Sequence, residues 1–270
     1  MPQLITAQTA LCGIVLHPAG HTKSPLMHNA AFLEMDIDAR YVAFDVPPEK
    51  LPEAIAGVRA LGLKQLAVSV PHKVEVMALL DEVDPGAQQI GAVNTVTLRD
   101  GRLVGSNTDW VGSNRALERE TTLAGKRAVV LGAGGAARGV VFGLLERGAT
   151  VHVLNRTVEK AETLVKDLGA ESAGTMADLV SLDHDLLVNT TSVGLRSDDS
   201  PVPAEHLRQG TVVMDAVYDP EETRLLRDAR ERGATVVHGK WMLIYQAAEQ
   251  IRTWTGREAP IDTLESAFRS

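Results

Sequence analysis

The chain has 270 residues, of which 44% are hydrophobic, and its formal net charge is −8 at pH 7. This length and composition favour a globular protein with one large core or two modest ones. The acidic balance argues against a general nucleic-acid surface, which needs a basic field to release counterions. The sequence has no basic-then-apolar leader and no apolar run of membrane-spanning length. We expect a cytoplasmic monomer or homodimer with no nucleic-acid or membrane partner.

The single cysteine, Cys12, excludes an intrachain disulfide and suits a reducing compartment. Its apolar neighbours predict a small core residue. His17, His21 and His28 lie close in sequence, but no fourth ligand has a spacing that suits zinc. We expect no metal site.

Residues 11–105 alternate strand and helix patterns. Strands are predicted at 11–16, 40–44, 63–70, 92–98 and 103–104. Helices are predicted at about 24–34, 47–62 and 71–80. Ser24 is the expected N-cap of the first helix, with Pro25 in its first turn. Asp100-Gly101 predicts a hairpin turn between the last two strands, so the sheet of this α/β region is mixed.

The rest of the chain repeats strand and helix with βαβ spacing. Strands are predicted at 127–131, 150–154, 186–188, 212–214 and 235–237. Helices are predicted at about 110–119, 135–147, 158–168, 223–232 and 240–254. We predict two domains: residues 1–112, completed by C-terminal helices at about 240–270, and a Rossmann-like domain at 113–239.

A glycine-rich turn follows the strand at 127–131. Gly132, Gly134 and Ala137 fit the pattern G-x-G-x-x-G/A, which places a pyrophosphate against a tight turn and a helix N-terminus. An ordinary glycine turn is the alternative. The candidate phosphate-binding residues are Gly132, Ala133, Gly134, Gly135 and Ala136.

The residues after the strand at 150–154 carry information on the cofactor. Asn155, Arg156 and Thr157 stand where an NAD-binding fold offers a carboxylate to the ribose. Arg156 can bind a 2′-phosphate in bidentate fashion, and Lys160 lies one helical turn further on. The alternative is a solvated helix face with Thr157 as its N-cap. This charge pattern predicts NADP rather than NAD.

Asn189, Thr191 and Ser192 follow the strand at 186–188. Open α/β sheets bind ligands at the carboxyl ends of their strands. We therefore expect these three residues to contact the cofactor.

Nine short motifs follow one another along the chain: Gly13 with residues 21–29, then residues 68–73, 91–95, 107–109, 132–136, 155–157, 189–194, 215–218 and 242–248. In this order they resemble the shikimate dehydrogenase family over nearly the whole chain, from Gly13 to Gly256. The resemblance implies reversible hydride transfer between NADP and a ring hydroxyl of shikimate, giving 3-dehydroshikimate, in aromatic amino acid biosynthesis. It also implies a substrate domain at 1–112 and an NADP domain at 113–239.

In this family, the residues that match Lys73 and Asp109 bind the reacting hydroxyl and handle its proton. Lys73 falls in the first turn of the helix predicted from Pro71, which is the unfavourable end of the helix dipole for a cation. An exposed lysine and a first-turn carboxylate are the alternatives from the residues alone. We treat the pair as one acid/base unit and leave the proton holder open.

The resemblance also implies the other contacts. Thr22 and Ser24 would hold the substrate carboxylate near a helix N-terminus. Ring hydroxyls would be bound by Ser69, Asn94 and Gln246, and Tyr218 would help to close the pocket. Gly239 and Met242 would lie beside the nicotinamide.

Several residues depart from the common family pattern. Thr22 and Ser69 keep a hydroxyl, whereas Ala67 and His17 replace common asparagines. Trp241 stands where glycine is usual, and it either packs in the apolar stripe of the last helix or narrows the pocket. Ser69 also resembles the quinate/shikimate branch, which makes quinate the nearest alternative substrate. An NADP-binding sensor without catalysis and another two-domain dehydrogenase, such as one acting on a folate, are further alternatives.

Overall fold

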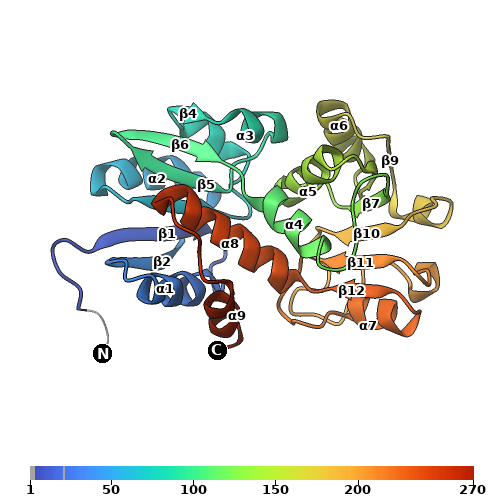
Figure 1. The fold of residues 1–270 in the computed structure, drawn as a ribbon. Coiled ribbons are helices and arrows are strands. Elements are labelled where there is room, and N and C mark those ends of the chain that lie inside the picture. Colours follow the sequence, from blue (N-terminus) through green and yellow to red (C-terminus); the bar gives the residue numbers. More distant parts are fainter. Residues whose placement is uncertain (1–3, 21) are drawn as a thin grey trace. The chain divides into compact units, whose positions relative to one another are not determined.

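The computed structural model describes residues 4–20 and 22–270. His21, one of the three neighbouring histidines, lies outside the described residues. The chain divides into two compact units (Figure 1). Unit 1 comprises Met1–Thr108 and Gln246–Ser270, and unit 2 comprises Asp109–Tyr245.

Unit 1 is built on a six-stranded sheet, which is mixed, as predicted. Its strands are β1 (Ala10–Leu16), β2 (Ala39–Asp45), β3 (Gln65–Val68), β4 (Glu82–Val83), β5 (Thr95–Arg99) and β6 (Arg102–Ser106), in the order β2-β1-β3-β5-β6-β4. β1 pairs in parallel with β2 and β3, whereas β5 is antiparallel to both of its neighbours. The hairpin between β5 and β6 turns at Asp100 and Gly101, which both have positive φ.

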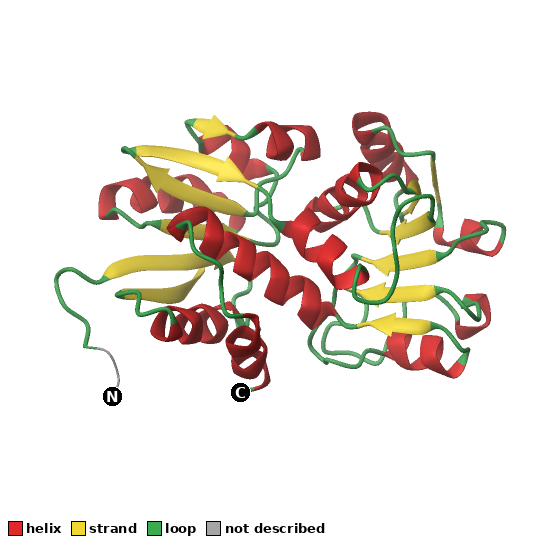
Figure 2. Ribbon diagram, in the orientation of Figure 1, coloured by secondary structure: helices red, strands yellow, loops and turns green. Residues whose placement is uncertain are grey.

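Helices cover both faces of this sheet (Figure 2). They are α1 (Ser24–Glu34), α2 (Leu51–Leu61), α3 (Pro85–Ile90), the second half of α8 (Gly239–Thr255) and α9 (Ile261–Arg269), with 3₁₀ turns at Pro48–Lys50 and Glu75–Leu79. α2 buries Leu51, Ile55 and Val58, as its periodicity predicts, and ends at left-handed Gly62. On the other face, His28 of α1 stacks on Tyr41 of β2, and Phe32 contacts Trp254 of α8.

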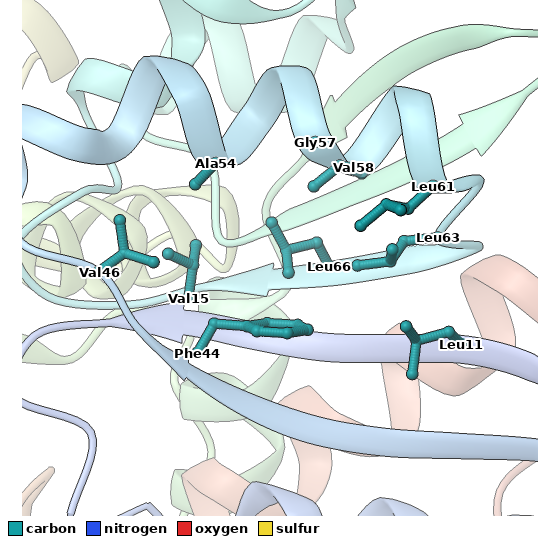
Figure 3. A pocket seen from close by; sticks show the side chains of 10 residues that line it. All are labelled: Leu11, Val15, Phe44, Val46, Ala54, Gly57, Val58, Leu61, Leu63 and Leu66. Carbon is teal, nitrogen blue, oxygen red and sulfur yellow. The ribbon is translucent and has the colours of Figure 1, made fainter.

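An apolar cavity of about 230 Å³ lies between α2 and the first three strands. Figure 3 shows its lining side chains, which come from β1, β2, β3, α2 and the segments beside them. The residues that line it are Leu11, Val15, Phe44, Val46, Ala54, Gly57, Val58, Leu61, Leu63 and Leu66. Because none of these side chains is polar, the cavity offers nothing to orient a polar substrate.

Unit 2 is a doubly wound parallel sheet, as predicted. Its strands are β7 (Arg127–Leu131), β8 (Thr150–Leu154), β9 (Ser172–Gly174), β10 (Leu186–Asn189), β11 (Val212–Asp215) and β12 (Thr235–Val237), in the order β12-β11-β10-β7-β8-β9. This is the strand order of a dinucleotide-binding sheet, in which the direction of winding changes between β7 and β10. A ligand crevice is therefore expected at the carboxyl ends of these two strands.

The helices of unit 2 are α4 (Asp109–Leu117), α5 (Gly135–Glu146), α6 (Val158–Leu168), α7 (Arg224–Glu231) and the start of α8, with 3₁₀ turns at Met176–Val180 and Ala204–His206. α4 packs closely on α5 at Gly143. The Asn114 side-chain amide donates to the Gly143 carbonyl at 2.8 Å, and a Cβ at Gly143 would lie 2.8 Å from Asn114 Oδ1. Glycine at this position thus permits the contact between the two helices.

Among the described residues, no helix is long and apolar enough to cross a membrane. Within the same residues, no three histidine, cysteine or acidic side chains gather in a way that could hold a metal ion. Cys12 is buried and unpaired, and burial raises the pKa of its thiol to about 12. It is a core residue, as predicted.

Candidate active site

Unit 1 gathers its predicted substrate residues at one edge of its sheet. The carboxyl ends of β1, β3 and β6 and the start of β5 meet there, because β5 is antiparallel to β3 and β6. Main-chain hydrogen bonds join these ends, from His17 N to Val70 O at 3.0 Å and from Val93 N to Lys73 O at 2.8 Å. The residues placed at this edge are Thr22, Ser24, Ser69, Lys73, Asn94 and Thr108.

The start of α1 differs from the prediction. Lys23, not Ser24, occupies the N-cap position, and its side chain makes no capping bond. Ser24 is the first helical residue, and its N–H donates to the Thr22 hydroxyl at 3.2 Å. The expected serine cap was therefore wrong, because the preceding threonine supplies the oxygen. Both hydroxyls lie at a helix N-terminus, where a carboxylate is stabilised.

The segment that carries Lys73 also differs from the prediction. Residues 71–74 form a turn, and only Glu75–Leu79 are helical, as a 3₁₀ turn. The Lys73 carbonyl accepts from Val93 N, whereas Met77 N, its partner in an α-helix, donates to the Val74 carbonyl instead. The helix-dipole argument for Lys73 was thus wrong. The same bond places Lys73 beside the segment that leads into Asn94.

Asn94 is the centre of a buried hydrogen-bond network in unit 1. Its Oδ1 accepts from Thr108 N at 2.8 Å, and its Nδ2 donates to Thr108 Oγ1 at 3.0 Å. Nδ2 also approaches Oε1 of Gln246, from α8, at 3.5 Å. The side chains of Asn94, Thr108 and Gln246 are all buried. The sequence analysis assigned no role to Thr108, although this residue lies within the matching stretch 107–109.

Asp109 follows Thr108 directly and is the first residue of α4. Its side chain is only 4% exposed. A buried carboxylate in the first helical turn is stabilised by N–H groups that have no intrahelical partner. The structural reading of Asp109 as a first-turn carboxylate is therefore compatible with the role that the family resemblance implies.

The glycine-rich turn of unit 2 leaves room for a phosphate. Gly132 has a φ of 109°, and a Cβ there would lie 2.7 Å from Thr190 Oγ1, which joins the ends of β7 and β10. Gly134 is the N-cap of α5, makes no side-chain cap and has open space where a Cβ would stand. Ala133, Gly135 and Ala136 complete this turn. Its accessible N–H groups fit the pyrophosphate of a dinucleotide.

The loop after β10 is shaped by Asn189. Its Oδ1 accepts from the Thr191 main chain at 3.0 Å and from the Thr191 hydroxyl at 2.7 Å, while its Nδ2 donates to Asp215 at 2.9 Å. Burial raises the pKa of Asp215 to about 6, although three hydrogen bonds oppose this shift. These bonds hold Thr191 and Ser192 at the edge where β7 ends.

The segment after β8 presents two cations. Arg156 and Lys160 are exposed and form no ion pair within the part of the chain that the structure describes. Thr157 occupies the N-cap position of α6 as predicted, but its side chain makes no capping bond. Asn155 Nδ2 donates instead to the Thr157 carbonyl at 2.8 Å. Such a pair of cations beside a ribose position fits a 2′-phosphate.

The remaining predicted residues of unit 2 follow β11 and β12. Tyr218 is half-buried in the loop after β11, at the cofactor edge of unit 2. Gly239 begins α8, and a Cβ there would lie 2.6 Å from the Asp215 carbonyl oxygen, so no larger residue fits. Met242 is buried one turn further along α8.

Trp241 packs within unit 2. The Arg119 guanidinium, just beyond the end of α4, lies 3.7 Å over the Trp241 ring, and Tyr245 stacks beside it at 5.9 Å. Arg119 also donates to the Tyr245 hydroxyl at 3.0 Å. Trp241 is therefore half-buried in a cation–π contact that ties the end of α4 to α8, which supports the packing interpretation.

These two units define a class of two-domain α/β protein in which a dinucleotide-binding sheet is paired with a smaller mixed-sheet unit carrying a lysine and a buried amide network. Three family models match the chain. The shikimate dehydrogenase substrate binding domain matches residues 14–96, the shikimate / quinate 5-dehydrogenase model matches 114–194, and the shikimate 5'-dehydrogenase C-terminal domain matches 239–267. The chain belongs to the shikimate dehydrogenase family.

Individual relatives match this chain over more than nine tenths of their length. The shikimate dehydrogenase (NADP(+)) of Thermococcus kodakarensis is 47% identical over 258 residues, covering 93% of this chain and 92% of the relative. A shikimate dehydrogenase solved with NADP+ is 42% identical, with a TM-score of 0.93 over 98% of this chain and 96% of that one. The enzyme from Thermus thermophilus, solved with NADP(H) and shikimate, is 39% identical, with a TM-score of 0.90 over 96% of this chain and 98% of that one.

Proposed function

We propose that this protein is an NADP-dependent shikimate dehydrogenase, which catalyses the reversible reduction of 3-dehydroshikimate to shikimate in aromatic amino acid biosynthesis. The observation that carries the proposal is the gathering of Lys73, two hydroxyls at a helix N-terminus and the Asn94 network at one sheet edge, in a member of this family. These residues can bind a carboxylate and several hydroxyls, and they can transfer a proton.

The proposed substrate contacts lie mainly in unit 1. Thr22 and Ser24 hold the substrate carboxylate at the N-terminus of α1. Ser69, Asn94 and Gln246 bind ring hydroxyls. We add Thr108 to this set, because its N–H donates to Asn94 Oδ1 and its hydroxyl accepts from Asn94 Nδ2. Lys73 and Asp109 hold and move the proton of the reacting hydroxyl. Tyr218 helps to close the pocket.

The proposed cofactor contacts lie in unit 2. When bound, NADP would supply the hydride acceptor for shikimate oxidation, and NADPH would supply the hydride donor for the reduction. The turn Gly132–Ala136 receives the pyrophosphate, while Arg156 and Lys160 receive the 2′-phosphate beside Asn155 and Thr157. Asn189 holds Thr191 and Ser192 in place, and Gly239 and Met242 shape the nicotinamide end. On this assignment residues 1–112, with about 240–270, bind substrate, and 113–239 bind NADP.

We further propose that the enzyme works in the cytoplasm as a monomer or homodimer. The only cysteine is buried and unpaired, which suits a reducing compartment.

Replacing Lys73 tests the catalytic assignment. In Lys73→Ala, kcat for shikimate oxidation should fall about 100-fold or more, because proton transfer by a positioned side chain typically contributes that much. The Kd for NADP, measured by calorimetry, should stay within about twofold, because Lys73 belongs to unit 1.

Lys64→Ala is the matched control, since Lys64 is an exposed lysine at the opposite end of β3. It should keep wild-type turnover. Unchanged turnover in Lys73→Ala would refute the role of Lys73.

A further inference from the structure

Asn94 lies at the end of a directed chain of hydrogen bonds that begins on α8. Gln250 Nε2 donates to Thr95 Oγ1 at 3.0 Å and to the Asn94 carbonyl at 3.2 Å. The Thr95 hydroxyl then donates to Asn94 Oδ1 at 2.8 Å. All three side chains are 2% exposed or less. The chain is thus shielded from water, and its bonds are strong relative to exposed ones.

Main-chain groups at both ends of this series of hydrogen bonds fix which side-chain atoms donate and which accept. The Asn94 carbonyl can only accept, so the Gln250 atom that faces it must be the nitrogen. Thr108 N–H can only donate, so the Asn94 atom that faces it must be Oδ1. The Thr95 hydroxyl has one proton. Because Gln250 donates into its oxygen, that proton is directed to Asn94 Oδ1.

These directed hydrogen bonds determine the orientation of the Asn94 amide. A rotation that exchanged Oδ1 and Nδ2 would place the NH₂ group against the Thr108 N–H and against the directed Thr95 hydroxyl, leaving buried donors unpaired. The amide therefore has one orientation, with Nδ2 on the side of Thr108 Oγ1 and Gln246.

We propose that Thr95 and Gln250 are positioning residues, which fix the orientation in which the Asn94 amide takes part in binding a ring hydroxyl of the substrate. Neither residue needs to touch the substrate. The inference rests on the proposed role of Asn94 in binding shikimate.

Gln250 reaches this position because it lies one helical turn beyond Gln246 on α8. The Gln65 side chain holds the helix there, since its Nε2 donates to the Gln250 carbonyl at 3.0 Å. One face of α8 thus supplies Gln246, which lies next to Asn94, and Gln250, which orients the Asn94 amide.

A double-mutant cycle in the full-length protein tests the proposal. Thr95→Val removes the donor to Asn94 while keeping the side-chain shape. It should raise the Kd for shikimate, measured by calorimetry, about three- to tenfold, the range for one lost hydrogen bond. It should raise KM for shikimate similarly, with kcat and the Kd for NADP within about twofold. Thr95→Ser should restore the wild-type values.

In an Asn94→Ala background, Thr95→Val should change the Kd for shikimate by less than about 1.5-fold, because Thr95 then has no amide to orient. Gln250→Glu should act as Thr95→Val does, since a carboxylate would draw the Thr95 proton away from Asn94. Thr97→Val is the matched control. Thr97 is a buried threonine of the same strand, and its hydroxyl has no hydrogen-bond partner among the described residues.

An equal effect of Thr95→Val with and without Asn94, or an equal effect of Thr97→Val, would show a merely structural role and overturn the inference. An unchanged Kd in Thr95→Val would overturn it as well. If the wild-type protein failed to bind shikimate at all, the proposed function would fail first, and the inference would fail with it.

Discussion

On the proposed assignment, the choice of cofactor depends on Arg156 and Lys160. Arg156 follows β8, Lys160 lies in the first turn of α6, and both are exposed; no carboxylate pairs with them among the residues that the structure describes. This pattern was readable from the sequence, because the position after the second strand of a βαβ unit is fixed by the fold.

Replacing Arg156 should therefore change cofactor preference. In Arg156→Ala, the Kd for NADP should rise about 10- to 100-fold through the loss of charged hydrogen bonds, while the Kd for NAD should stay nearly constant. Calorimetric titration of both nucleotides measures this. Lys166→Ala, an exposed lysine further along α6, serves as the control. A parallel loss of affinity for NAD would contradict the assignment.

The buried network around Asn94 could be predicted only in part at the residue scale. Asn94 and Gln246 were expected from family motifs, but Thr108, Thr95 and Gln250 were not. Gln250 is 155 residues from Thr95 in the chain, so no local pattern links them. Their contact depends on the way α8 packs on the sheet of unit 1.

At the scale of elements, local patterns predicted most helices and strands. The stripe of α2 and the Asp100-Gly101 hairpin were confirmed. Two predictions were wrong: residues 71–74 form a turn whose Lys73 carbonyl bonds to Val93 N instead of an α-helix, and β3 ends at Val68 rather than at residue 70. The short strands β4 and β9 were missed because two or three residues carry no periodicity.

The turn between β7 and α5 should tolerate no side chain at Gly132. In Gly132→Ala, the Cβ would lie 2.7 Å from Thr190 Oγ1, at a φ that alanine rarely adopts. The Kd for NADP should rise at least about tenfold, while the Kd for shikimate should not change, because we propose that the pyrophosphate binds against this turn.

Gly169→Ala provides the control for backbone strain, because Gly169 also has a positive φ but open space around it. It should lower the free energy of unfolding by about 1 kcal/mol and leave the Kd for NADP unchanged. Equal losses of NADP affinity in the two variants would refute the steric argument.

The stability of the whole molecule should depend on pH through two buried groups of opposite sign. Burial lowers the pKa of His28 to about 3 and raises that of Asp215 to about 6. His28 contributes stability above its unfolded pKa of about 6.5, and this is lost as the pH falls towards 3. Asp215 contributes stability below its unfolded pKa of about 3.9, and this is lost as the pH rises through 6.

Two variants should separate these contributions. His28→Phe keeps a ring to stack on Tyr41. When the pH falls from about 7 to about 4, the free energy of unfolding of this variant should decrease by about 3 kcal/mol less than that of the wild type. Asp215→Asn should gain stability relative to the wild type as the pH rises through about 6. Urea unfolding at several pH values measures both. Differences from the wild type that do not vary with pH would contradict the account.

The most direct test of the central claim is nicotinamide reduction by the purified wild-type protein, with NADP or NAD as oxidant and shikimate or quinate as substrate. The account predicts rapid reduction with NADP and shikimate and much slower reduction in the other three mixtures. A preference for quinate or for NAD would contradict the substrate or cofactor assignment and direct attention to Ser69 or Arg156. No reduction in any mixture, with NADP still bound, would contradict the assignment as an enzyme of this reaction.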